Sequence, residues 1–171
     1  DRLSAYELHP ADGDALKALF AGDTAVKAIA LDGWLALGAH VPPKEKRGLV
    51  LIDPPFEKVS EVEDIATALG RALHRWRGGI YAVWYPMKRQ ATVERLRGAL
   101  AEVAPGEVVF AEFLVEPMSA EERFVGTGLA VINPPFVFAA EAEALLSRLL
   151  PVLGRGRTAT FAVKQRPMGG S

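Results

Sequence analysis

The chain has 171 residues, of which 50% are apolar and 24% charged, and its 20 Lys and Arg against 21 Asp and Glu give a net charge of −1. This composition is that of one globular domain, and it excludes a disordered chain and a strongly basic protein that coats nucleic acid. There is no cysteine, which excludes disulfides, thiolate zinc sites and cysteine nucleophiles and is compatible with a reducing, cytoplasmic setting. No stretch approaches about 20 uninterrupted apolar residues, so no membrane span is expected.

Apolar runs of strand length alternate with amphipathic stretches of helix length along the chain. The predicted strands are 4–8, 26–31, 49–53, 80–85, 108–115, 128–133 and 158–163, and the predicted helices are 12–21, 60–77, 89–103 and 139–150. Several strand runs are solidly apolar, which is typical of strands buried on both faces of a parallel sheet. The alternation therefore predicts a single α/β domain over residues 1–171, with a mostly parallel sheet and helices on both of its faces.

Two helix starts carry residues that are typical of caps. Asp12 is a plausible N-cap for the first helix, and Ser60 with Glu63 predicts a capping box at the start of the helix 60–77. Acidic residues early in this second helix and arginines late in it match the direction of the helix dipole.

The segment that indicates chemistry is the apolar run 49–52 with Asp53, Pro54, Pro55 and Phe56 after it. In an open α/β sheet, ligands bind beyond the carboxyl ends of the strands, where Asp53 is expected to lie. The prolines lack N–H donors, so the Asp53 carboxylate and a backbone carbonyl remain as two acceptors for the N–H groups of an exocyclic amine. Phe56 offers a flat face on which a base can stack.

This arrangement is the one that amino-methyltransferases use, because two acceptors hold the amine with its nitrogen lone pair toward an electrophilic methyl group. Positioning of the amine, more than proton abstraction, would supply most of the catalysis. The alternative interpretation is an ordinary turn after a strand, in which Phe56 is simply packed.

A second segment has the same form, with Asn133, Pro134, Pro135 and Phe136 after the apolar run 129–132. Chain order separates the two, because a methyltransferase sheet has about three strands after this motif. The predicted strands 80–85, 108–115 and 128–133 follow Asp53, whereas a single strand follows Asn133. We assign the site to Asp53 and interpret the second segment as a structural turn.

Two further acids end predicted strands. Glu7 is placed to accept hydrogen bonds from ribose hydroxyls, and Asp32 to accept from an adenine amine, with Gly33 allowing close approach of the backbone. Glu7, Asp32 and Asp53 are separated by 25 and 21 residues, which is about one strand–helix unit each. We therefore expect all three acids to line one edge of the sheet.

Five blocks of the sequence, at 6–10, 31–34, 47–57, 81–86 and 131–135, together resemble the RlmJ family of bacterial 23S ribosomal RNA adenine-N6 methyltransferases. The blocks occur in order over nearly the whole chain. The resemblance implies a Rossmann-like fold that uses S-adenosylmethionine. It also implies that Glu7 contacts the ribose and Asp32 the adenine of this cofactor, and that residues 53–56 contact the target adenine.

The sequence departs from the family at its beginning. The family's first strand with its Asp and glycine-rich turn, its N-terminal segment and a helical insertion are not among these residues, so we expect the chain to be the C-terminal two-thirds of such an enzyme. Gly126-Thr127-Gly128 precedes a strand and does not open a helix, so we do not assign it as a cofactor loop. A sheet without its first strand lacks a central member, and we expect residues 1–171 alone to bind S-adenosylmethionine poorly.

The sequence thus predicts transfer of a methyl group from S-adenosylmethionine to N6 of an adenine in 23S ribosomal RNA, with ribosomal RNA as the partner. No metal is expected, because the three histidines are scattered without paired spacing. The alternatives are an amino-methyltransferase that acts on DNA or on a protein amide, and a non-catalytic α/β binding module. A cytoplasmic monomer is favoured, although the residues do not specify the oligomeric state.

Overall fold

The computed structural model describes residues 1–45 and 47–166, and these residues form seven strands, five α-helices and one short 3-10 helix. The strands are β1 (Leu3–Glu7), β2 (Val26–Ala30), β3 (Leu49–Ile52), β4 (Ile80–Met87), β5 (Val108–Leu114), β6 (Gly126–Ile132) and β7 (Thr160–Arg166). The helices are α1 (Pro10–Leu19), α2 (Gly33–Ala39), α3 (Glu61–Arg75), α4 (Gln90–Val103) and α5 (Phe138–Leu153), with η1 at Gly156–Thr158. Every predicted strand and helix is present, with ends shifted by a few residues.

The strands form two sheets. β1 and β2 pair in parallel as a small sheet, and the larger sheet has the order β3-β4-β6-β5-β7. Within the larger sheet β3 and β4 are parallel, whereas β6 runs antiparallel to both β4 and β5, and β7 runs antiparallel to β5. The fold is therefore mixed α/β.

The expectation of a mostly parallel sheet holds for β1 to β4 and is wrong for the C-terminal strands. β5 and β6 are joined by a loop without a helix, and such a connection permits an antiparallel pair, whereas parallel neighbours need a longer crossover. The apolar pattern did not distinguish the two cases, because these antiparallel strands are also buried on both faces by helices.

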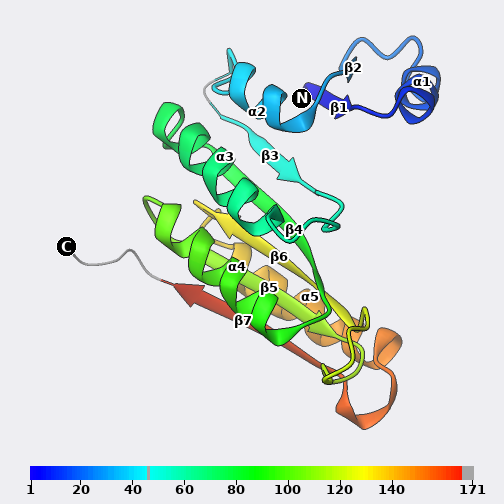
Figure 1. Cartoon of the computed structure of the whole chain (residues 1–171), viewed down its shortest axis with the longest axis vertical. Coiled ribbons are helices and arrows are strands. Elements are labelled where there is room, and N and C mark those ends of the chain that lie inside the picture. Colours follow the sequence, from blue (N-terminus) through cyan, green and yellow to red (C-terminus); the bar gives the residue numbers. More distant parts are fainter. Residues whose placement is uncertain (46, 167–171) are drawn as a thin grey trace.

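Helices cover both faces of the larger sheet, as predicted. Figure 1 shows α3 and α4 side by side on one face and α5 on the opposite face, with the small sheet, α1 and α2 at the end of the molecule next to β3. The strands β3, β4 and β5 end at one edge of the larger sheet, where β6 and β7 begin. We call this edge the carboxyl edge.

The core lies between the helix pair and β4. Ile65 and Leu69 of α3 and Leu96 and Leu100 of α4 are at most 1% exposed, and they pack in one cluster with the side chains of β4 that point to this face. The three- and four-residue spacing in α3 predicts this stripe directly, because such positions lie on one side of a helix. This packing holds β4 in the centre of the molecule and so supports the strand ends at the carboxyl edge.

The helix starts differ from the prediction. α1 begins at Pro10 with His9 as its N-cap, because proline has its φ already set for a first helical position. Asp12 lies within the first turn and contacts His9 at 3.2 Å. The capping box is wrong as well: the Ser60 hydroxyl donates to Asp64 at 3.2 Å, and Ser60 has a ψ of 0°, far from the extended conformation of a capping residue.

Candidate active site

The Asp-Pro-Pro-Phe turn lies at the carboxyl edge, directly after β3. Asp53 is exposed and Pro54 is buried, so the carboxylate faces solvent while the chain beneath it is held in place. Phe56 is half-buried and has a φ of +53°, a conformation that is an outlier for a bulky side chain. Backbone strain of this kind persists only where the surroundings enforce it, and it is common at ligand sites.

Trp84 supports Phe56. Their ring centroids are 6.3 Å apart with an interplanar angle of 67°, which is an edge-to-face contact. Trp84 lies on β4, one residue beyond the Val83 that pairs with Ile52 of β3. The sequence analysis did not place Trp84 at the site. The position of this tryptophan, late in the predicted strand that follows the motif, could have indicated it.

The Asn133 segment lies at the opposite edge of the sheet. Ile132 pairs with Tyr81 near the start of β4, because β6 is antiparallel to it. The Asn133 amide donates to the carbonyls of Arg77 and Gly79, both at 2.8 Å, so its donors tie down the connection between α3 and β4. Its φ of +54° is one that asparagine tolerates. These contacts are those of a structural turn, which was the preferred interpretation.

Glu7 and Asp32 both lie at the carboxyl end of the small sheet, because Glu7 ends β1 and pairs with Ala30, two residues before Asp32, in a parallel ladder. Glu7 Oε1 accepts from the backbone N–H of His9 at 2.7 Å. Asp32 Oδ1 caps α2 by accepting from the N–H groups of Trp34 at 2.8 Å and Leu35 at 3.0 Å. Each carboxylate thus uses one oxygen locally, and a carboxylate has acceptor capacity for more than these bonds.

Gly33 is the first residue of α2 and is exposed. A Cβ added there would meet no protein atom within 4 Å, so packing within the chain does not require glycine at this position. No other part of this chain approaches Gly33 closely enough to require a glycine. The predicted close approach of a cofactor to Gly33 stays a prediction.

The three acids lie on two sheets. Figure 1 shows the arrows of β1 and β3 pointing toward the same side of the molecule, with the small sheet beyond the free edge of β3. The helix α2 links the two parts, since the Arg75 guanidinium on α3 donates to the Leu37 carbonyl at 2.8 Å. The register places Glu7 and Asp32 at the same end of the small sheet, but it does not by itself place Asp53 beside them.

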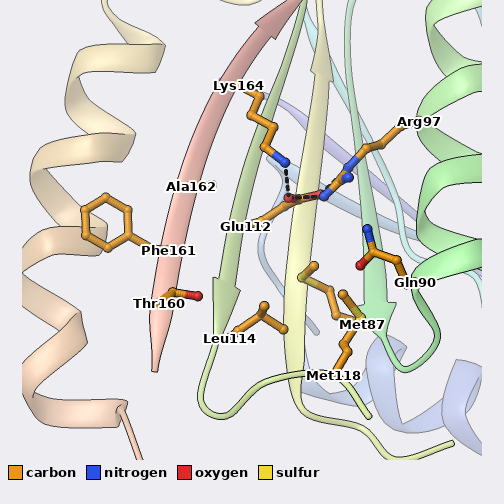
Figure 2. Close-up of a pocket in the computed structure, with 10 residues that line it drawn as sticks. All are labelled: Met87, Gln90, Arg97, Glu112, Leu114, Met118, Thr160, Phe161, Ala162 and Lys164. Atoms are coloured by element: carbon orange, nitrogen blue, oxygen red, sulfur yellow. Dashed lines mark hydrogen bonds and ion pairs between the residues drawn. The ribbon is translucent and has the colours of Figure 1, made fainter. Parts of the chain in front are cut away.

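The sequence analysis missed a buried ionic cluster, which joins side chains of β4, β5, β7 and α4. Glu112 of β5 is 4% exposed, and its Oε1 accepts from the Tyr85 hydroxyl at 2.6 Å and from Arg97 Nε at 2.7 Å. Arg97 also donates to Oε2, and Lys164 lies 4.0 Å from the same atom, as Figure 2 shows. Burial and the adjacent Glu112 carboxylate raise the pKa of Tyr85, so its hydroxyl stays neutral and donates to Glu112. Glu112 is an acid within the otherwise apolar run 108–115, and this could have indicated a buried charge that needs a partner.

The described residues contain neither a cluster of metal ligands nor a membrane-spanning helix. Within residues 1–45 and 47–166, no three or more His, Asp or Glu side chains are grouped to hold a metal ion. Within the same residues, no helix combines the length and the apolar character needed to cross a lipid bilayer.

Parallel strands followed by antiparallel C-terminal strands, with helices on both faces and an Asp-Pro-Pro-Phe turn at the carboxyl edge, define a Rossmann-like α/β fold. The chain belongs to the family described as "Ribosomal RNA large subunit methyltransferase D, RlmJ", whose model matches residues 1–164.

Relatives and solved structures agree with this family. The chain is 32% identical over 164 residues to Ribosomal RNA large subunit methyltransferase J of Haemophilus influenzae and 32% identical over 153 residues to that of Escherichia coli. It covers 58% and 53% of these relatives, and they match 96% and 90% of the chain, so it spans just over half of their length.

Among solved structures, protein LPL1258 from Legionella pneumophila matches with a TM-score of 0.86 and 32% identity, over 96% of this chain and 60% of that one. A probable spermidine synthase from Corynebacterium glutamicum matches with a TM-score of 0.59 and 20% identity, over 94% of this chain and 57% of that one. At this identity the second likeness concerns the fold alone.

Proposed function

We propose that the protein containing this chain transfers a methyl group from S-adenosylmethionine to N6 of an adenine in 23S ribosomal RNA. The observation that carries the proposal is the turn at residues 53–56, where an exposed carboxylate stands at the carboxyl edge above a buried proline and a strained aromatic residue. Membership of the RlmJ family supports ribosomal RNA as the substrate. That substrate implies a cytoplasmic reaction, and we retain a monomer as the expected state.

The proposed chemistry follows from the acceptors of this turn. The Asp53 carboxylate and the Pro54 carbonyl each accept one N–H of the adenine amine, which directs the nitrogen lone pair away from both. Transfer forms a bond from this nitrogen to the methyl carbon, breaks the bond from that carbon to sulfur, and releases one amine proton. Asp53 would receive the proton, and its larger contribution would be to hold the amine in a reactive geometry.

Phe56 and Trp84 would hold the target base. The adenine has to leave its stack in the RNA to reach the carboxyl edge, which costs free energy. Stacking on the Phe56 ring would offset part of this cost, by about 1–3 kcal/mol. Because Trp84 supports the Phe56 ring edge-on, the ring orientation is set before RNA binds.

Glu7 and Asp32 would hold the cofactor, which supplies the electrophilic methyl group when it is bound. Ribose hydroxyls and an adenine amine are donors, and both acids retain acceptor capacity beyond their local hydrogen bonds. The residues present therefore fit the two ends of an adenosine group. Gly33, next to Asp32, leaves space free of protein atoms on that side.

Asp53→Ala in the full-length protein tests the proposal. We expect methyl transfer to ribosomal RNA to fall at least about 100-fold, the scale for losing a positioned catalytic group, with little change in thermal stability because Asp53 is exposed. Glu57→Ala, an exposed acid in the same loop, is the matched control and should retain activity. Turnover by Asp53→Ala at the wild-type rate would refute the role of this residue.

The acceptor class is tested separately. Incorporation of labelled methyl groups into naked ribosomal RNA, DNA and protein should favour RNA, and the modified nucleoside should be N6-methyladenosine. Labelling of DNA or of a protein amide would favour the alternative acceptors, and no labelling of any of them would favour a non-catalytic binding module.

A further inference from the structure

A cavity of about 200 Å³ lies between the start of α4 and β7, and Figure 2 shows the residues that line it, among them Arg97, Glu112 and Lys164 of the ionic cluster. One wall is apolar and is formed by Met87, Leu114 and Met118. The other side carries Thr160 and Lys164 of β7. A cavity of about 150 Å³ is enough for a benzene-sized ring, so this one has room for a planar base.

The cavity is positively charged. Arg97 is held by both oxygens of Glu112, and these two charges compensate each other. Lys164 lines the cavity, is more than half exposed, and lies 4.0 Å from the same carboxylate, so its ammonium group is open to solvent beside the cavity. The buried pair and this lysine leave a net charge of about +1 on a lining that also carries the neutral polar side chains of Gln90 and Thr160, and this mixture suits a planar group with an anion attached.

Two more cations lie in the segment that leads into β7. η1 ends two residues before Thr160 and carries Arg157, and Arg155 lies just before η1. The Arg155 N–H donates to the Val115 carbonyl at 2.9 Å, which places this loop next to the end of β5. Both arginines are exposed, and no ion pair to either is found among the described residues 1–45 and 47–166.

The cavity and the Asp53 turn share the carboxyl edge. Gly128 of β6 pairs with Glu112 on one side and with Tyr85 on the other. Asp53 is level with Trp84, the residue before Tyr85, because Ile52 pairs with Val83. Three to four strand spacings separate the two places along the sheet, which is about 15–20 Å. Trp84 and Tyr85 are neighbours on β4 and point to opposite faces, so the cavity lies on the other face of the sheet from the Phe56–Trp84 contact and the path between them is longer than this spacing. Stacked nucleotides rise about 3.4 Å each, so a strand of RNA would need at least about five nucleotides to cover it.

We infer that this cavity binds a second nucleotide of the RNA, at least about five positions from the target adenine, with its base against the partly exposed Leu114 and Met118 and its phosphate at Lys164. The inference rests on the proposed function for the identity of the ligand. Thioether sulfurs make favourable contacts with aromatic rings, and lysine is a general phosphate contact. A second anchored nucleotide would fix the register of the RNA while the target base leaves its stack.

The test is RNA binding without methyl donor, measured by fluorescence anisotropy over a range of salt on a 23S ribosomal RNA fragment and the full-length protein. Lys164→Gln removes one phosphate contact, so affinity at about 0.1 M salt should fall about five- to eightfold and the salt slope by about 0.7–0.9. Lys27→Gln, an exposed lysine on the small sheet, is the matched control and should change neither.

Met118→Ala tests the base contact through a cycle with RNA that carries abasic nucleotides. Single abasic positions, placed one at a time at about five or more nucleotides from the target, should include one that weakens binding by the wild type but causes no further loss in the variant. Unchanged affinity in both Lys164→Gln and Met118→Ala would overturn the inference. This outcome is distinct from failure of the proposed function, which would appear as absent methyl transfer by a wild-type protein that still binds RNA.

Discussion

Tyr85 and Gly128 show how one side chain dictates the identity of a residue on the next strand. The two residues pair across β4 and β6, and the Tyr85 ring lies over Gly128 to reach Glu112 on β5. A Cβ added to Gly128 would lie 2.1 Å from the ring carbon that carries the hydroxyl, which is closer than real contacts allow. Packing therefore accounts for the glycine that the sequence analysis considered and rejected as part of a cofactor loop.

Gly128→Ala should destabilise the fold by about 1–3 kcal/mol, because the buried ring has to leave its position over the strand. Gly98→Ala is the matched control: Gly98 lies inside α4, is exposed, and would place its Cβ in open space. That substitution should stabilise the chain by about 0.5–1 kcal/mol, since alanine favours helix. Urea unfolding measures both, and equal effects of the two substitutions would contradict the packing argument.

The buried tyrosines give the fold an alkaline limit. Burial raises the pKa of Tyr81 from 10.0 to about 12, while the nearby charge of Arg75 lowers it in part. The folded-state pKa is above the unfolded one, so the contribution of Tyr81 to stability is complete below about pH 10 and is lost as the pH rises toward about 12. The free energy of unfolding should fall across this window.

Tyr81→Phe should reduce that fall, because it removes the group that ionises in the unfolded chain. Unfolding by urea at about pH 9 and about pH 11 measures the difference for the wild type and the variant. Burial raises the pKa of Tyr85 as well, so part of the fall should remain in the variant. An identical fall in both proteins would exclude a contribution from Tyr81.

At the scale of elements, α2 is the piece that joins the small sheet to the rest. It was not predicted as a helix, because its seven residues are too few to show a period. Trp34 packs against the main core, and the Leu37 carbonyl accepts from Arg75 of α3. The cap that starts α2 is Asp32, so one side chain both positions this helix and serves as a candidate cofactor contact.

Asp32→Ala should therefore change two measurements. Loss of the cap should lower stability by about 0.5–2 kcal/mol, and in the full-length protein the affinity for S-adenosylmethionine should fall as well. Ser60→Ala at the start of α3 is the control, because Ser60 makes no capping hydrogen bond and its loss should cost only a few tenths of a kcal/mol. Unchanged cofactor affinity in Asp32→Ala, measured by calorimetric titration, would leave Asp32 with the capping role alone.

At the scale of the whole molecule, the candidate cofactor residues and the candidate catalytic turn lie on separate sheets. Glu7 and Asp32 belong to the small sheet and Asp53 to the larger one, and no ladder joins the two sheets within the described part of the chain. The free edge of β3 exposes Leu49 and Leu51 by 64% and 65%. A ligand that needs all three acids requires these sheets to be held in a fixed relation.

Residues 1–171 alone should consequently bind S-adenosylmethionine weakly. Packing of α2 on α3 is the described link between the sheets, and ordering them around a ligand would consume part of the binding free energy. Calorimetric titration of this chain and of the full-length protein measures the difference. Binding as tight by residues 1–171 as by the full-length protein would show that the two sheets are already aligned.

The sequence by itself determined the elements and the position of the main motif. Strand runs, the α3 stripe and the placement of Asp53 after a strand are consequences of local periodicity, because side-chain direction repeats every two residues in a strand and about every 3.6 in a helix. Chain order was also enough to prefer Asp53 over Asn133.

The tertiary structure decided which distant residues meet. Strand order and direction place Asn133 at the opposite edge from Asp53, bring Tyr85 across Gly128 to Glu112, and set Trp84 beside Phe56. The local pattern contains none of these contacts, because parallel and antiparallel strands that are buried on both faces have the same apolar sequence. These contacts are determined by the pairing of strands that are far apart in the chain.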